Sequence, residues 1–193
     1  METRVDVVER LMTADECALL VRECGAVVAP SGLLGAKIDG YRTSSSTHVL
    51  FRDEHSPEVD ALIKRLSARV SEITGLPREN QEDPQLARYR VGEQYKPHHD
   101  FFFPKTEYYA RTMARGGQRV WTVLIYLQAP DRGGHTEFTK LGQNLMPGVG
   151  SALVWRNVRA DGVLDMDTLH AGRPVEEGEK WIMTFWVRER KFV

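Results

Sequence analysis

The sequence predicts a mainly β protein, a sandwich or open barrel supported on one side by N-terminal helices. Two helical patterns occur before about residue 85. After that point short segments rich in Val, Ile, Tyr, Trp and Thr favour strands, and glycine-containing turn signals separate them. We expect one domain over residues 1–193, with helical support and a loop in 1–84 and the β core in 85–193.

The first part of the chain contains two helix-start signals. A short strand over 5–8 precedes a capping box that begins at Thr13, and Gly25 is expected to end this helix. Ser56 caps a second, longer helix with regular apolar spacing. The Gly- and Ser-rich stretch 30–47 between them is interpreted as a long loop, either a lid over a binding site or a plain connector.

The second part of the chain contains four clear strand patterns. They are expected at 86–91, 119–128, 151–155 and 180–188. In the last of these, both alternating faces carry large apolar side chains, which predicts a strand covered on both sides. Lys180 opens this strand, where it either meets an anion in the interior or extends its stem to reach solvent.

Composition and charge exclude some classes of partner. Twenty-six basic residues oppose 27 acidic ones, a net charge of −1 that gives no global attraction to nucleic acid or anionic membrane. No apolar run approaches the roughly 20 residues of a membrane span, and the charged N-terminus lacks a secretory pattern. Cys17 and Cys24 lie about two helical turns apart, too far for a disulfide. We therefore expect a cytoplasmic protein with two buried thiols and no nucleic-acid or membrane partner.

The triplet His98-His99-Asp100 indicates a metal site. In extended chain residues two apart share a face, so His98 and Asp100 point together while His99 points away. They would supply two of the three ligands of a two-histidine, one-carboxylate set, which leaves positions open on iron(II). The same set also permits a catalytic zinc, and the triplet alone also occurs without any metal.

A second segment supplies the missing histidine. His170 begins a pattern that we interpret as a strand, a tight turn at 177–178 and a returning strand that starts at Lys180. Such a hairpin would bring Lys180 alongside His170, next to the other candidate ligands.

Together these segments resemble the prolyl 4-hydroxylase branch of the 2-oxoglutarate-dependent oxygenases. The first family motif, Tyr-x-x-Gly-x-x-Tyr-x-x-His-x-Asp, is matched by Tyr89, Gly92, Tyr95, His98 and Asp100. The second, His-x-Gly-x-Pro-Val-x-x-Gly-x-Lys-Trp, is matched by His170, Gly172, Pro174, Val175, Gly178, Lys180 and Trp181. Further similarities, in order along the chain, cover most of the sequence.

The resemblance implies a double-stranded β-helix, or jelly-roll, whose iron(II) is held by His98, Asp100 and His170. It also implies that Lys180 pairs with the distal carboxylate of 2-oxoglutarate. Two further residues, Tyr89 and Thr122, would hydrogen-bond around this co-substrate. The residues implied to lie toward the substrate are Tyr95, Arg119, Trp186 and, in a substrate loop, Arg42.

The family's chemistry requires O2 and 2-oxoglutarate, with ascorbate as reductant, and yields succinate and carbon dioxide as an unactivated C–H is hydroxylated. The resemblance predicts a prolyl residue in a peptide or protein as substrate. The alternatives are a free amino acid or natural-product intermediate, and a non-catalytic sensor of metal or 2-oxoglutarate. Nucleic-acid demethylation fits the neutral charge less well.

Three positions depart from the family pattern. His135 replaces a common Glu, Thr139 a common Pro, and Trp121 a small residue beside Thr122. Trp121 could indicate a smaller pocket, which keeps the free amino acid open as substrate. His135 is interpreted as a turn residue rather than a rival ligand, because the ligand set is complete without it.

Overall fold

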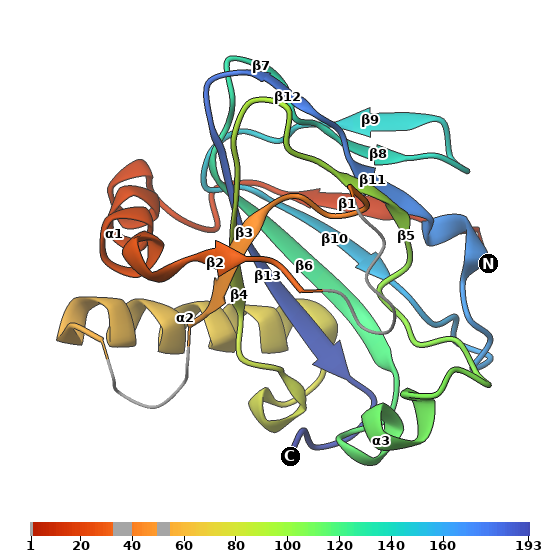
Figure 1. Ribbon diagram of the computed structural model, residues 1–193. Helices are drawn as coiled ribbons and strands as arrows, with labels where there is room; N and C mark the ends of the chain where they lie inside the picture. Colours follow the sequence, from red (N-terminus) through yellow and green to blue (C-terminus); the bar gives the residue numbers. More distant parts are fainter. Residues whose placement is uncertain (1, 33–39, 50–54) are drawn as a thin grey trace.

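The computed structural model describes residues 2–32, 40–49 and 55–193, and its core is a pair of antiparallel sheets that face each other (Figure 1). The large sheet contains, in spatial order, β1 (Val5–Val8), β10 (Ala152–Arg156), β6 (Arg119–Gln128), β13 (Lys180–Arg188), β4 (Gln85–Tyr89), β3 (Ser45–His48) and β2 (Ala29–Pro30). The small sheet contains β5 (Tyr95–His98), β11 (His170–Gly172), β8 (Thr136–Phe138) and β9 (Gln143–Leu145).

The remaining elements connect or support these sheets. Strands β7 (Arg132–Gly133) and β12 (Val175–Glu177) pair with each other at one end of the molecule. The helices are α1 (Ala14–Cys24), α2 (Pro57–Thr74), α3 (Tyr109–Ala114) and the 3-10 turns η1 (Gly25–Val27), η2 (Arg78–Asn80) and η3 (Met166–Thr168). Among the described residues, no helix is long and apolar enough to cross a bilayer.

The central strands of the large sheet are buried on both faces, as the sequence predicts for β13. On β6 the odd-numbered residues, such as Val123 and Ile125, pack with α1 and α2. The even-numbered Leu124 and Tyr126 face the small sheet and form a second apolar cluster. The two helices therefore cover one face, and the cavity between the sheets adjoins the other. The expected β core with helices on one side is confirmed.

The two helix starts are confirmed by their caps. Thr13 and Glu16 form the reciprocal capping box of α1, and the Ser56 hydroxyl accepts a hydrogen bond from the Val59 amide at the start of α2. Gly25 ends α1 as predicted, but in a right-handed conformation with φ −71°, and the chain continues into η1. Glycine is needed there for space, because an added Cβ would lie 2.7 Å from the ring of Trp181.

The loop predicted over 30–47 is partly wrong. Residues 45–48 form β3, which pairs with β4 and β2 at the edge of the large sheet. The stretch has a polar, serine-rich sequence, and the hydroxyl of Ser31 bonds to those of Ser44 and Ser46. Residues 33–39 lie outside the described part of the chain, so the lid interpretation stays untested.

The hairpin predicted between His170 and Lys180 is also wrong. His170 belongs to β11 in the small sheet, whereas Lys180 begins β13 in the large sheet, and β12 between them pairs with β7. The turn at Glu177 and Gly178 exists, but the strands that it joins lie in different sheets. The two side chains therefore approach the cavity from opposite sides.

Candidate active site

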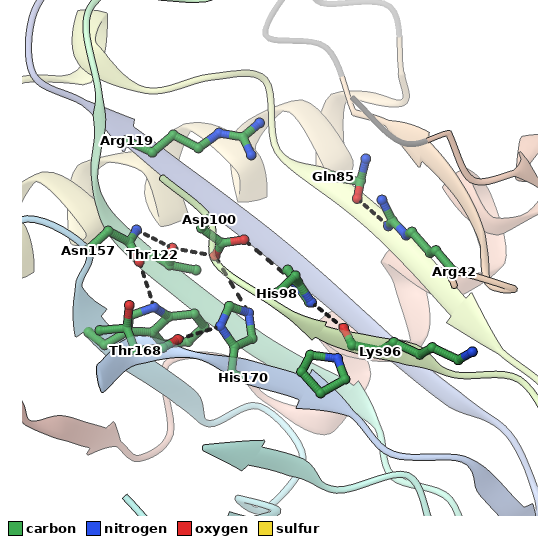
Figure 2. A network of polar contacts seen from close by, with 12 residues as sticks. Arg42, Gln85, Lys96, His98, Asp100, Arg119, Thr122, Asn157, Thr168 and His170 are labelled. Carbon is green, nitrogen blue, oxygen red and sulfur yellow. Dashed lines mark hydrogen bonds and ion pairs between the residues drawn. The ribbon is translucent and has the colours of Figure 1, made fainter. Parts of the chain in front are cut away.

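Two histidines on neighbouring strands form the centre of the site. His98 on β5 and His170 on β11 are direct cross-strand partners, with ring centroids 4.2 Å apart. Asp100 follows two residues after His98, and each imidazole Nε2 lies 3.8 Å from one of its carboxylate oxygens. One ligand atom from each of the three residues lies within 4.8 Å of the others (Figure 2). The structure thus brings together the three predicted metal ligands.

The imidazole orientations are fixed by backbone carbonyls. The Nδ1 atom of His98 lies 2.9 Å from the carbonyl oxygen of Lys96, and that of His170 lies 2.9 Å from the carbonyl oxygen of Thr168. A carbonyl oxygen only accepts, so each Nδ1 carries the proton and donates it. The Nε2 lone pairs are then free to point toward Asp100, which is the arrangement that a bound metal requires.

The local electrostatics favour the metal-binding protonation states. Burial, followed by the neighbouring His170, holds the pKa of His98 well below its ordinary value, which keeps the imidazole neutral. Burial alone would raise the pKa of Asp100, but His170, His98 and Arg119 outweigh it, so the pKa is lowered. A neutral imidazole and an ionised carboxylate are the forms that bind a divalent cation.

Lys180 provides a buried cation in the same cavity. Lys180 is 2% exposed. Its Nζ lies 4.7 Å from the ring centroid of Tyr126 and 5.4 Å from that of Tyr89, which is the cross-strand partner of Lys180 on β4. Burial lowers the pKa of Lys180 to about 7, and no hydrogen bond or ion pair to its ammonium is present within the described residues. A buried cation of this kind favours an anionic ligand.

The two residues predicted to contact the co-substrate, Tyr89 and Thr122, differ in their position relative to the cavity. Tyr89 lines the cavity beside Lys180. The Thr122 hydroxyl instead donates to Oδ2 of Asp100 at 2.7 Å, and Thr122 is not among the cavity-lining residues described. Its hydroxyl proton is therefore used by the metal-ligand carboxylate, and a contact between Thr122 and the co-substrate stays a prediction.

Of the predicted substrate residues, three line the cavity. Tyr95 stacks on His98 with ring centroids 3.5 Å apart, and the guanidinium of Arg42 lies 4.8 Å from the Tyr95 ring. Arg42 also donates to the side-chain oxygen of Gln85 at 2.6 Å (Figure 2). Trp186 forms another part of the lining.

Arg119 differs from the other substrate predictions. Its Nε and Nη2 atoms both donate to the carboxylate of Glu82 at 2.7 Å, and its guanidinium lies 3.8 Å from the ring centroid of Trp186. Oε1 of Glu82, which accepts from Nε of Arg119, also lies 3.1 Å from Nε of Arg188. This buried network supports the wall formed by Trp186. Sequence reasoning did not find Glu82 or Arg188, since their partners lie far away in the chain.

Two of the departures from the family pattern, Trp121 and His135, lie outside the ligand set. Trp121 is on the helix-facing side of β6, with the guanidinium of Arg156 5.0 Å from its ring centroid, so it does not narrow the cavity. His135 is not part of the ligand cluster found among the described residues. His99 turns away as predicted, and its Nε2 lies 3.1 Å from the carbonyl oxygen of Met166.

Comparison with known proteins agrees with this geometry. Residues 84–188 match the family model of the 2OG-Fe(II) oxygenase superfamily. The chain is 35% identical to prolyl 4-hydroxylase subunit alpha-2 of Caenorhabditis elegans over 84% of its own length and 31% of the nematode protein. It is 32% identical to probable prolyl 4-hydroxylase 8 of Arabidopsis thaliana, with 99% of this chain and 70% of the plant protein covered.

A solved structure agrees over nearly the whole chain. The viral collagen prolyl hydroxylase of Paramecium Bursaria Chlorella virus-1, in its 2OG complex, superposes with a TM-score of 0.74 at 26% identity, covering 95% of each chain. Fold and site together define an iron(II)- and 2-oxoglutarate-dependent dioxygenase. The chain belongs to the 2OG-Fe(II) oxygenase superfamily and is prolyl 4-hydroxylase-like.

Proposed function

We propose that this chain hydroxylates a prolyl residue in a peptide or protein. The observation that carries the proposal is one cavity that holds the His98, Asp100 and His170 ligand set, the buried cation of Lys180, and an aromatic wall that contains Trp186. The names of the nematode, plant and viral relatives, all prolyl hydroxylases, support the choice of substrate class.

The residues of the chain divide the work of this reaction. Bound iron(II) with 2-oxoglutarate supplies the activation of O2. His98, Asp100 and His170 would hold the metal through two imidazole nitrogens and a carboxylate. Lys180 would bind and orient the distal carboxylate of 2-oxoglutarate as a point charge.

On the substrate side, Tyr95 and Trp186 would form the faces against which a prolyl ring packs. The Glu82 carboxylate holds Arg119 against Trp186, which keeps this wall in one orientation. Such walls act mainly by orienting the substrate C–H bond next to the metal.

The test is a coupled measurement of succinate and hydroxyproline with iron(II), 2-oxoglutarate and ascorbate. A panel of prolyl peptides should stimulate succinate formation, and the peptides should gain one oxygen at proline by mass spectrometry. His170→Ala should abolish both signals because it removes a metal ligand. Stimulation by free amino acids alone would replace the proposal with a small-molecule hydroxylase. Tight binding of iron and 2-oxoglutarate without turnover on any substrate would replace it with a sensor.

One observation that favoured a free amino acid, the bulk of Trp121, does not hold in the structure. The smaller pocket was inferred from Trp121, whose ring packs on the helix side of the large sheet rather than in the cavity. The peptide substrate is therefore the candidate that the described site supports best.

A further inference from the structure

A line of hydrogen bonds runs from the protein core to the metal-ligand carboxylate. The indole Nε1 of Trp155 lies 2.9 Å from Oδ1 of Asn157, and Nδ2 of Asn157 lies 2.8 Å from the hydroxyl of Thr122. The hydroxyl of Thr122 lies 2.7 Å from Oδ2 of Asp100 (Figure 2). The first three residues are fully buried, and Asp100 is 6% exposed.

The chemistry of the first donor fixes the direction of the whole line. An indole nitrogen only donates, so Asn157 must present its oxygen to Trp155 and its NH2 group to Thr122. The Thr122 oxygen therefore accepts from Asn157. The single proton of the hydroxyl is then turned toward Asp100, where it occupies one lone pair of Oδ2.

The backbone holds each member of this line in place. Thr122 lies in the middle of β6, directly opposite Trp155 on β10. The backbone amide of Asn157 donates to the carbonyl of Val120 at 2.9 Å, and its carbonyl accepts from Asp165 at 2.9 Å. The centroid of the Trp155 ring also lies 4.9 Å from that of the His170 ring in an edge-on contact. Trp155 therefore packs against one metal ligand, His170, and begins the line of hydrogen bonds that ends at another, Asp100.

We propose that Asn157 is a positioning residue that acts through Thr122 to hold the carboxylate of Asp100 in the orientation that binds the metal. A carboxylate with one oxygen held by a fixed donor has fewer orientations to lose when it binds a cation. Mutation of a residue that hydrogen-bonds to a metal ligand typically weakens metal affinity by about 10- to 100-fold. The inference rests on the metal site in the proposed function.

The first test measures iron(II) affinity directly, by anaerobic competition with a chromogenic chelator. Thr122→Val keeps the shape but removes the hydroxyl, and it should weaken iron(II) binding about 10- to 100-fold. Thr122→Ser restores the donor and should bind close to wild type. Ser67→Ala removes another buried hydroxyl, which lies on α2 and donates to the side-chain oxygen of Gln81, and it should leave iron affinity unchanged. Thermal unfolding of each variant checks that it is folded.

The second test asks whether Asn157 acts through Thr122. Asn157→Leu should weaken iron(II) binding in the wild-type background but cause no further loss in the Thr122→Val background. If Thr122→Val alone does not fold, iron(II) affinity is measured in the Thr122→Val/Asn157→Leu double variant. In that variant the leucine at position 157 replaces the amide that would otherwise be left without its hydroxyl partner. Additive losses, or unchanged iron affinity in folded Thr122→Val, would overturn the inference. A wild-type protein that binds no iron(II) would instead remove the metal site on which the proposed function depends.

Discussion

The buried ammonium of Lys180 indicates that the ligand of this site carries a negative charge. It is buried with no counter-ion among the described residues, and burial lowers its pKa to about 7. The ligand-free protein is therefore less stable than it would be with an apolar side chain at this position. A 2-oxoglutarate carboxylate would remove that deficit, so stability and co-substrate binding are linked at this residue.

Replacing this lysine separates the two effects. Lys180→Met should raise the free energy of unfolding of the ligand-free protein by about 1–4 kcal/mol, because it removes a desolvated charge. The same change should abolish stabilisation by 2-oxoglutarate. Urea unfolding with and without 2-oxoglutarate measures both. Lys140→Met, at an exposed lysine, is the control and should change neither. Unchanged 2-oxoglutarate binding in Lys180→Met would contradict the assigned role.

The pKa of Lys180 also predicts a pH dependence. Between about 7 in the folded state and the ordinary 10.5, the unfolded chain binds a proton that the ligand-free folded chain does not. The free energy of unfolding of the ligand-free protein should therefore rise with pH across this window. Affinity for 2-oxoglutarate should change in the opposite direction and fall as pH rises through about 7, because the ammonium form binds the carboxylate.

Calorimetric titration of the metal-loaded protein at about pH 6 and about pH 9 measures this fall. Lys180→Arg is the control, since a guanidinium stays charged throughout that range. Its residual affinity should not follow the wild-type decline. An identical decline in both proteins would assign the pH dependence to the metal ligands instead.

At the scale of elements, helix α1 is positioned on the large sheet by a close contact with β13. Gly25 has a right-handed backbone, so alanine is acceptable there conformationally, yet its Cβ would lie 2.7 Å from the Trp181 ring. Gly25→Ala should therefore lower the free energy of unfolding by about 1–3 kcal/mol through overpacking. Chemical denaturation measures this. Gly32→Ala, where an added Cβ meets nothing within 4 Å, should cause no comparable loss.

An ion network joins the segment after η2 to two strands of the large sheet. Glu82, which follows η2, contacts Arg119 on β6 and Arg188 on β13. The two arginines outweigh burial and lower the pKa of Glu82, although burial is the larger single influence and acts in the opposite sense. The carboxylate is thus a shared partner of two buried cations.

Loss of the Glu82 carboxylate should strongly destabilise the folded protein. Glu82→Gln should lower the free energy of unfolding by about 3–5 kcal/mol, because it leaves buried guanidinium charges uncompensated. It should also raise KM for a prolyl peptide, since Arg119 then no longer holds Trp186. Glu176→Gln breaks an exposed pair with Arg132 and should cost about 0–1 kcal/mol. Equal effects of both variants would contradict the network.

At the scale of the whole molecule, the cavity joins the two sheets. His98 and His170 come from the small sheet, whereas Lys180 comes from the large one. Metal alone would bind mainly to residues of the small-sheet side, whereas 2-oxoglutarate would contact both the metal and Lys180. Each ligand at about 100 times its Kd stabilises the folded state by about 2.7 kcal/mol.

Metal and 2-oxoglutarate together should therefore raise Tm by more than the sum of their separate effects. Thermal unfolding with each ligand and with both measures the synergy. His170→Ala should abolish it, because the small-sheet contribution is lost. Additive shifts in the wild type would show that the two ligands bind independently.

Local patterns predicted much of this fold and site. Strands β6 and β13 occur at the predicted bounds, and the caps of α1 and α2 are those expected. Alternation along an extended chain also predicted that His98 and Asp100 point together while His99 turns away. These features depend on residues within a few positions of one another, where backbone periodicity fixes which side chains share a face.

The sequence by itself determined the identity of the metal ligands and of the buried lysine, because two short motifs name all four residues. Only the tertiary structure decided which strands join which sheet, and so it corrected the His170–Lys180 hairpin and the direction of Trp121. It also found the partners Glu82 and Asn157, which bond to residues 35 or more positions away. Pairing across such separations is set by the packing of the whole chain, and periodicity within one segment carries no record of it.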